Sequence, residues 1–201
     1  MSVNASILGC SALTLGKEER AFFRDVRPWG FILFKRNVET PDQVRRLVDD
    51  LRTTVDREDA PVLIDQEGGR GQRRGPPHWP DYPPGRASGQ LAGNDPLLRR
   101  EITRLGARLL AHDLRALGIN VDCVPVLDVP DPSGHEVIGD RAYGTTPEEV
   151  GLLGRAAAEG LIAGGVLPVI KHIPGHGRAM ADSHHDLPVV EATYEELDAR
   201  D

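Results

Sequence analysis

An α/β fold with a parallel sheet is predicted by two features of the sequence. Short apolar runs rich in branched side chains alternate with longer segments in which apolar residues recur at helical spacing. Most of the short runs are apolar throughout, which is typical of strands that are buried on both faces. The chain of 201 residues is long enough to bury a core as one domain without a metal ion or a disulfide bond.

The predicted strands are the apolar runs at residues 5–8, 30–34, 62–65, 120–126 and 167–171. After the third run, five prolines fall between Pro76 and Pro84, so this segment is predicted to be irregular. A helix is expected to follow most of the strands. Five βα units and the start of a sixth are more than an isolated motif contains.

Four helix starts are indicated by capping residues, and in three of them proline occupies the first helical position. The predicted N-caps are Thr40, Asp95, Thr146 and Thr193. The first three helices have apolar faces at helical spacing, which are predicted to be buried. These faces are Val44, Leu47, Val48, Leu51 and Val55; Leu98, Ile102, Leu105 and Leu109; and Val150, Leu153, Ala157 and Leu161.

The composition excludes several classes of protein. The chain has 31 acidic and 24 basic residues and a formal net charge of −7, which argues against nucleic acid or an anionic membrane surface as its main partner. No apolar run approaches the roughly 20 residues that span a bilayer, and the start lacks the pattern of a secretion signal. Cys10 and Cys123 have apolar neighbours and are predicted to be buried free thiols in the cytoplasm.

Charged side chains are concentrated after the third predicted strand. In a parallel α/β fold, reactive residues gather where strands end and the following loops begin. Residues 65–74 hold two carboxylates, Asp65 and Glu67, with three arginines and three glycines. Because burying unpaired charge is costly, the loop is either the wall of a ligand pocket or a solvated turn with an internal Asp-Arg pair. Its glycine spacing matches neither a Walker A loop nor a dinucleotide-binding loop.

The loop after the fourth predicted strand contains Asp140 and Arg141, with a glycine on either side. A guanidinium in this position can clamp a substrate carboxylate or hydroxyl. The alternative is that Asp140 and Arg141 only hold the loop together.

Four of the seven histidines lie within residues 171–188, after the fifth predicted strand. Imidazole exchanges protons near neutral pH and also binds metals. A metal site is disfavoured, because the Pro174-Gly175 pair precludes the helix that would place His172 and His176 on one face. Asp182 and His184, two residues apart on a loop, suit a dyad in which the carboxylate orients the ring and supports its protonated form.

Three segments together resemble the family-3 glycoside hydrolases, specifically the bacterial β-N-acetylglucosaminidases (β-hexosaminidases) of peptidoglycan recycling. They are residues 64–70 (Ile-Asp-Gln-Glu-Gly-Gly-Arg), 171–177 (Lys-His-Ile-Pro-Gly-His-Gly) and 181–184 (Ala-Asp-Ser-His). The resemblance implies a (β/α)8 TIM-type barrel, of which this chain supplies about the first five βα units. It also implies a cytoplasmic hydrolase that releases terminal β-linked N-acetylglucosamine from muropeptides of the GlcNAc-1,6-anhydroMurNAc type, with no metal or organic cofactor.

The resemblance also implies roles for individual residues. Sugar binding is assigned to five side chains: Asp65, Arg73, Arg141, Lys171 and His172. His184 is implied as the general acid/base, with Asp182 as its partner, in a retaining mechanism through a covalent glycosyl-enzyme. A histidine in this role departs from the two carboxyl groups of most retaining glycosidases. Because it is neutral after it gives up its proton, attack by phosphate in place of water stays open.

In the family, the nucleophile is an aspartate on a loop after a later strand, whereas this sequence ends at Asp201, 17 residues after His184. Residues 1–201 are therefore expected to be the N-terminal barrel domain of a longer enzyme, monomeric when complete, with a small carbohydrate as partner. Little or no hydrolysis is expected from these residues alone. The alternatives are a non-catalytic sugar-binding or interaction fragment, or a metal-dependent hydrolase that uses the histidines.

Overall fold

Five parallel strands form one sheet in the computed structural model, which describes residues 2–93, 95–132, 134, 136–181 and 185–201. The strands pair in chain order: β1 (Asn4–Gly9), β2 (Pro28–Leu33), β3 (Val62–Ile64), β4 (Val121–Asp122) and β5 (Leu167–Pro168). The α-helices are α1 (Lys17–Val26), α2 (Pro41–Val55), α3 (Gly85–Gln90), α4 (Pro96–Arg115), α5 (Pro147–Ala163) and α6 (Tyr194–Arg200). The α/β class and the parallel sheet are confirmed, and α1 and α3 are helices that the sequence analysis did not predict.

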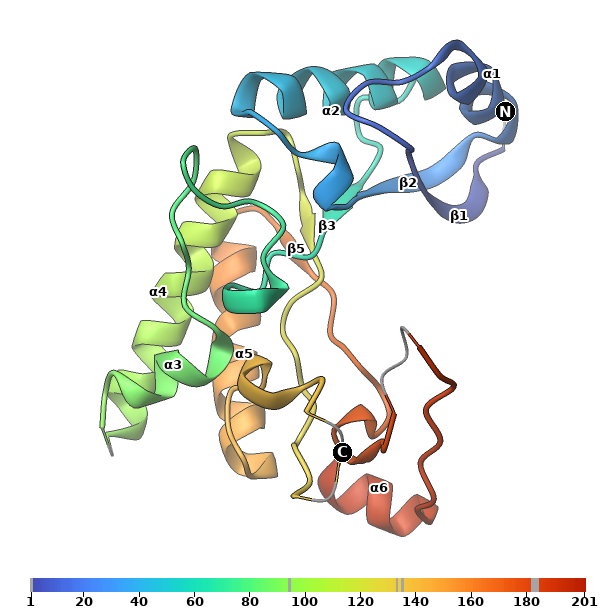
Figure 1. The fold of residues 1–201 in the computed structure, drawn as a ribbon. Helices are drawn as coiled ribbons and strands as arrows, with labels where there is room; N and C mark the ends of the chain where they lie inside the picture. Colours follow the sequence, from blue (N-terminus) through green and yellow to red (C-terminus); the bar gives the residue numbers. More distant parts are fainter. Residues whose placement is uncertain (1, 94, 133, 135, 182–184) are drawn as a thin grey trace.

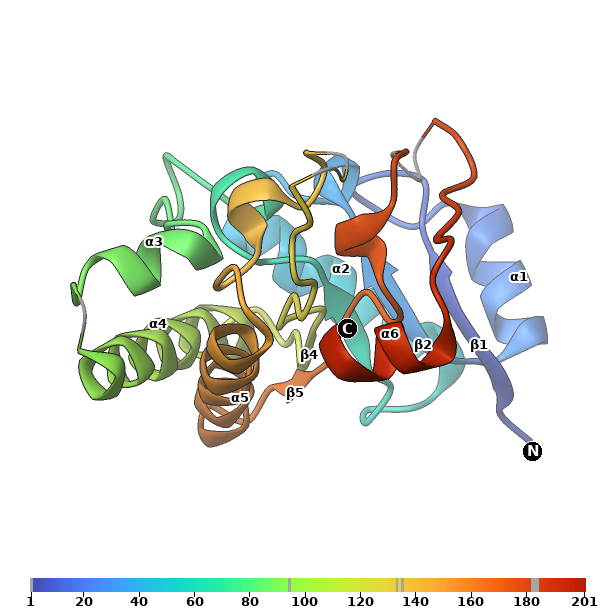
Figure 2. The same cartoon turned by 90° about the horizontal axis from the view of Figure 1, so that it is seen from below.

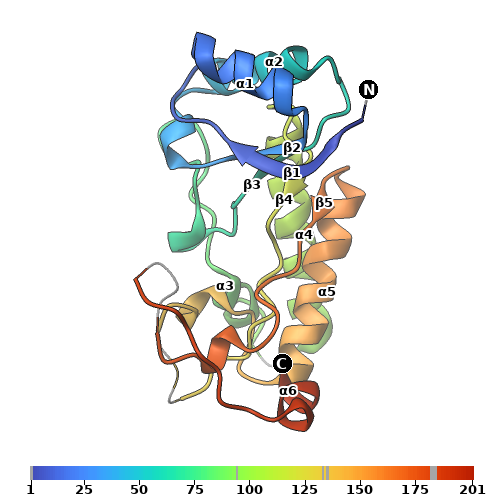
Figure 3. The ribbon, with the colours of Figure 1, turned by 90° about the vertical axis from the view of Figure 1, so that its right-hand side faces the viewer.

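Helices α1, α2, α4 and α5 line the outer side of the sheet (Figure 1 and Figure 2). Helices α1 and α2 lie together at one end of the molecule, and α4 and α5 run side by side along the later strands (Figure 1). Seen from below, α1, α2, α4 and α5 follow the curve of the strands (Figure 2). Helix α6 lies at the end opposite α1 and α2, next to the C-terminus (Figure 3). This arrangement is that of the first five units of a (β/α)8 barrel.

The last two strands are shorter than predicted. Regular pairing of β4 with β5 stops at Asp122 and Pro168, and the next bridge joins Val126 to Lys171. From Asp122 to Val126 the chain beyond β4 advances four residues, while from Pro168 to Lys171 the chain beyond β5 advances three. The extra residue interrupts the register, as in a β-bulge. Pro125, which has no N–H to donate, lies within the interruption. The backbone of Lys171 still donates to the carbonyl oxygen of Pro125 at 3.1 Å, so the chain beyond β5 stays beside the chain beyond β4.

Helices α2 and α5 begin and pack as predicted. The Thr40 hydroxyl accepts a hydrogen bond from the backbone N–H of Gln43 at 3.2 Å, and the Thr146 hydroxyl accepts one from Glu149 at 3.3 Å. Every residue of the two predicted apolar faces is buried. These faces fill the space between helix and sheet, which is where most helix stability in proteins arises.

Helix α4 turns a different face inward from the one predicted. Three leucines of the predicted face, Leu98, Leu105 and Leu109, are 47%, 47% and 57% exposed. The buried side chains of this helix are mostly smaller: Thr103, Ala107, Leu110, Ala111 and Leu114.

Close packing against α5 explains this difference. A methyl group added to Gly160 would lie 2.2 Å from the carbonyl oxygen of Arg104, and one added to Gly164 would lie 2.2 Å from the Ala111 methyl group. The two helices approach this closely only through small residues. The contact with α5, rather than the spacing of the leucines, therefore decides which face of α4 is buried.

Two further expectations concern burial and hydropathy. Cys10 and Cys123 are both buried free thiols, as predicted. Among the described residues, no helix combines the length and the apolar character that crossing a membrane requires.

Candidate active site

Four of the five predicted sugar-binding residues meet at the carboxyl ends of β3, β4 and β5. Asp65 directly follows β3, and Lys171 lies just beyond β5. The Lys171 ammonium is 2.8 Å from Asp65 Oδ1, and Arg73 Nη2 is 3.2 Å from Asp65 Oδ2. Asp65 therefore has a cation on each oxygen, one from its own loop and one from a loop 106 residues further along the chain. The internal Asp-Arg pair of the alternative interpretation exists, but it belongs to this larger cluster.

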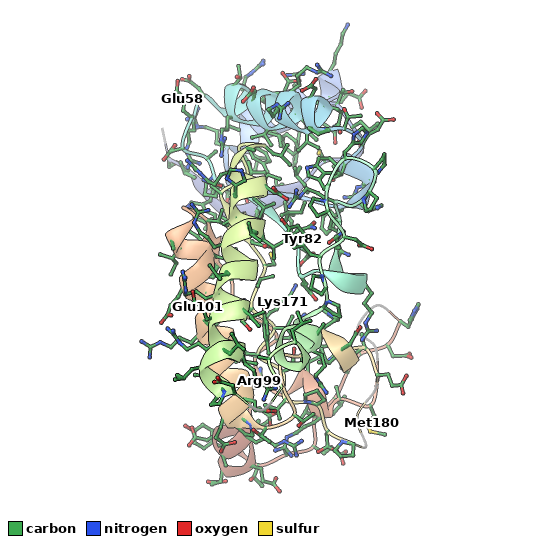
Figure 4. All side chains as sticks on the ribbon, turned by 90° about the vertical axis from the view of Figure 1, so that its left-hand side faces the viewer. Glu58, Tyr82, Arg99, Glu101, Lys171 and Met180 are labelled. Carbon is green, nitrogen blue, oxygen red and sulfur yellow. The ribbon has the colours of Figure 1, made fainter. Side chains whose placement is uncertain are left out.

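Glu67 joins Arg141 to this cluster, although the sequence analysis gave Glu67 no role. Arg141 Nε and Nη2 each donate to a Glu67 oxygen at 2.8 Å, and the Lys171 ammonium lies 2.6 Å from Glu67 Oε1. The Glu67 side chain is only 6% exposed. The five residues Arg73, Asp65, Lys171, Glu67 and Arg141 thus form a continuous row of alternating charge, which we call the ion-pair ladder. Lys171 stands near the middle of the molecule (Figure 4).

The ladder determines the charge states of its members. Burial alone would raise the pKa of Asp65 and of Glu67, but the cations beside them outweigh this effect, and both pKa values lie below their ordinary range. Burial alone would lower the pKa of Lys171, yet Glu67 and Asp65 hold it above its ordinary value. The ladder is therefore fully ionised near neutral pH and presents fixed charges of both signs.

The loop that presents Arg141 is held by two other arginines. Arg70 donates to the carbonyl oxygens of Glu136 and Ile138 at 2.8 and 2.9 Å and pairs with Asp140 at 3.0 Å. Arg86 donates to three further carbonyl oxygens of the same loop, those of Gly139, Ala142 and Gly144. Asp140 holds the loop, as the alternative interpretation proposed. Arg141 also holds it, since its Nη1 donates to the carbonyl oxygen of Val137 at 3.1 Å, and in addition it reaches across to Glu67.

His172, the fifth predicted sugar-binding residue, points to a different partner. Its Nδ1 lies 2.7 Å from Oδ2 of Asp128, a residue of the loop after β4 whose side chain is fully buried. Its ring packs edge to face on the ring of His176, with centroids 5.3 Å apart. The predicted dyad, Asp182 and His184, lies outside the described residues, so its arrangement stays a prediction.

Asp122 is a buried carboxyl group at the end of β4. Its Oδ1 accepts a hydrogen bond from the backbone N–H of Gln66 at 2.9 Å, and Oδ2 has no hydrogen-bond partner among the described residues. Complete burial raises the pKa of Asp122 to about 8, an effect that the Gln66 N–H only partly offsets. The folded protein therefore holds a proton on Asp122 at pH values where the unfolded chain has released it.

Asp122→Asn is expected to change how stability depends on pH. Between the unfolded pKa of about 4 and the folded pKa of about 8, unfolding of the wild type releases a proton, so its stability falls as pH rises. The variant cannot ionise, and the asparagine oxygen can still accept from Gln66. The free energy of unfolding is measured in urea at pH 5, 6.5 and 8. The value for the variant minus the value for the wild type should increase from each pH to the next. A constant difference would contradict a neutral Asp122.

The fold and the site together define a class of protein. A parallel βα sheet of this order is part of a TIM-type barrel, and the ion-pair ladder lies at the carboxyl ends of its strands, where the active sites of such barrels are found. Residues 9–201 match the Glycosyl hydrolase family 3 N terminal domain. The chain belongs to this family.

Individual relatives agree with this assignment. A beta-hexosaminidase of Methylococcus capsulatus is 42% identical over 189 residues, which cover 93% of this chain and 54% of the relative. The crystal structure of native NagZ from Neisseria gonorrhoeae matches with a TM-score of 0.89 at 32% identity and covers 98% of this chain and 57% of its own. The same NagZ in complex with N-trifluoroacetyl-D-glucosamine also gives a TM-score of 0.89 at 32% identity, with the same coverage. The chain thus spans about half the length of the relatives it matches.

Proposed function

We propose that residues 1–201 are the N-terminal, sugar-binding part of a β-N-acetylglucosaminidase. The enzyme would remove terminal N-acetylglucosamine from peptidoglycan-derived muropeptides in the cytoplasm. The observation that carries the proposal is the ion-pair ladder, because it offers a fixed set of charged donors and acceptors at the usual active-site position of a barrel. The N-acylated glucosamine bound by the Neisseria gonorrhoeae relative supports the class of sugar. The two buried free thiols support a reducing compartment.

The ladder residues have complementary roles in this proposal. The Asp65 carboxylate, kept ionised by Lys171 and Arg73, accepts hydrogen bonds from sugar hydroxyls. Lys171, Arg73 and Arg141 donate to sugar oxygens. His172 contacts the sugar from the loop beyond β5. Because the cations are already paired with carboxylates, the site is organised before the sugar arrives, which lowers the ordering cost of binding.

The chemical step is assigned to residues on the basis of the sequence motif. In the first half-reaction, His184, oriented by Asp182, protonates the leaving oxygen while an aspartate outside residues 1–201 bonds to the anomeric carbon. In the second, His184 takes a proton from water, and the water oxygen displaces that aspartate from the anomeric carbon. Two displacements retain the anomeric configuration.

Calorimetric titration of the 201-residue chain with N-acetylglucosamine tests the sugar-binding proposal. Saturable binding is expected, and Lys171→Met should weaken it roughly tenfold or more, since a hydrogen bond to a charged group contributes about 1.5–3 kcal/mol. Lys35→Met, which removes an exposed lysine from the loop after β2, is the matched control and should leave the affinity unchanged. Absence of binding, or equal effects of the two variants, would contradict the proposal.

Hydrolysis is tested on the gene product that contains residues 1–201, with p-nitrophenyl N-acetyl-β-glucosaminide as substrate. Turnover supports the enzyme. Binding of N-acetylglucosamine without turnover would instead favour a non-catalytic sugar-binding protein.

A further inference from the structure

Asp128 is bound to His172 through two different groups of that residue. Asp128 Oδ2 lies 2.7 Å from His172 Nδ1 and 3.3 Å from the backbone nitrogen of His172. The Asp128 side chain is fully buried, and its Oδ1 has no hydrogen-bond partner in the part of the chain that the structure describes. Because ring and backbone are held by one oxygen, the imidazole is fixed relative to its own main chain.

The chemistry of this contact determines where the ring proton is. An ionised carboxylate can only accept hydrogen bonds, so a nitrogen at 2.7 Å from it must carry hydrogen. In the neutral imidazole, protonation of Nδ1 leaves Nε2 with a lone pair and no proton. Nε2 is then the remaining polar atom of the ring, and it can only accept.

We propose that Asp128 is a positioning residue that fixes His172 as the Nδ1–H tautomer, so that His172 accepts a hydrogen bond from a sugar hydroxyl. The second half of this statement rests on the proposed function, in which His172 contacts the sugar. The ladder cations Lys171, Arg73 and Arg141 can only donate, whereas Asp65 in the proposed function accepts from a sugar hydroxyl. His172 therefore adds a second position, besides Asp65, at which the sugar must carry a hydroxyl that donates, while the cations need only an oxygen that accepts.

The substrate preference that follows is specific. Fluorine in place of a hydroxyl keeps some ability to accept a hydrogen bond but cannot donate one. At the hydroxyl held by His172, the fluoro and the deoxy sugar should therefore lose affinity equally, by about tenfold, which corresponds to the 1–1.5 kcal/mol of one hydrogen bond. At a hydroxyl held by Lys171 alone, the fluoro sugar should bind better than the deoxy sugar.

The tautomer is tested without any sugar by long-range proton–nitrogen correlation NMR on the 15N-labelled chain at pH 8. The His172 signals are assigned by their loss in His172→Gln. The expected spectrum has a protonated Nδ1 and an unprotonated Nε2. Asp128→Ala should shift the ring toward the Nε2–H form that isolated histidine favours. Asp128→Asn, which can still accept from the backbone N–H, serves as the variant that preserves the local shape.

An Nε2–H ring in the wild type, or a tautomer unchanged in a folded Asp128→Ala protein, overturns the proposal. If Asp128→Ala does not fold, the wild-type spectrum alone decides. Titration with deoxy and deoxyfluoro N-acetylglucosamines altered at the 3, 4 or 6 position tests the second half. The proposal is supported if, at one position, the deoxy and the fluoro sugar lose the same affinity and His172→Ala makes this loss smaller. It is overturned if the fluoro sugar binds better than the deoxy sugar at every position. If no sugar binds, the proposed function fails while the NMR result still stands.

Discussion

Glu67→Gln is expected to lower the free energy of unfolding by about 3 kcal/mol, the usual size of the loss when one partner of a buried ion pair is removed. Glu67 accepts two hydrogen bonds from Arg141 and faces the Lys171 ammonium, and its side chain is 6% exposed. Glutamine has the same size, but it carries no charge, and its NH2 group replaces one of the two oxygens that accept from the cations. Urea unfolding of the 201-residue chain measures the difference.

The effect of Glu67→Gln should depend on pH. Burial would raise the pKa of Glu67, but Arg141 and Lys171 hold it below its ordinary value. A carboxylate with a lowered folded pKa stabilises the fold above the unfolded pKa, about 4.3, and this contribution is lost as pH falls through the folded pKa. Wild type and variant should therefore differ most near pH 7 and converge in acid.

Glu101→Gln is the matched control for charge loss. Glu101 pairs with Arg104 on the exposed side of α4, away from the ladder (Figure 4). Surface pairs of this kind contribute little to stability. Equal destabilisation by the two variants would mean that the ladder is no more important to the fold than a surface pair.

His184→Ala is expected to reduce kcat of the complete enzyme by a factor of about 10²–10⁴, the usual contribution of a positioned general acid/base, with little change in KM. The ladder, which binds the sugar in the proposal, is untouched by this substitution. A p-nitrophenyl N-acetyl-β-glucosaminide assay measures the loss. The defect should shrink with a dinitrophenyl leaving group, because a leaving oxygen of low basicity needs less help from an acid.

His185→Ala is the matched control for His184→Ala. His185 is the neighbouring residue, is exposed, and has no role in the proposed mechanism. Its activity should stay within about twofold of the wild type. An activity of His184→Ala equal to that of His185→Ala would exclude His184 as the acid/base.

The fold was predictable where the capping residues and the apolar spacing of a segment match the way in which that segment packs. The N-caps of α2 and α5 and their buried faces follow from threonine, proline and apolar spacing, and both helices are confirmed. In α4 the leucine spacing predicted the wrong face, because Gly160 of α5 and Gly164 at its C-cap lie so close to α4 that only small residues fit at the contact. Helix α1 was not predicted, since its N-cap is Gly16, which has no side chain, and only Phe23 among its residues is buried.

That the candidate site residues lie close together was predictable in part, but how they are connected was not. Asp65 and Lys171 stand in recognisable motifs near strand ends, Arg73 and Arg141 lie in the loops that follow β3 and β4, and the structure brings the four together. Glu67 and Asp128 were not assigned roles, although both lie in the loops that the sequence marks as reactive. Their partners are at least 44 residues away along the chain, so only the spatial arrangement of the strands shows what they bind.

The ion-pair ladder also limits how this barrel can be re-engineered. Barrel enzymes are commonly diversified one loop at a time, because each loop is carried by its own strand. Here the loops after β3, β4 and β5 share one set of buried charges through Asp65, Glu67, Arg141 and Lys171. Transplanting one loop from a distant donor would leave the charges of the other two without partners. These three loops must therefore be exchanged as a set, because most variants in a library that recombines them singly would fail to fold.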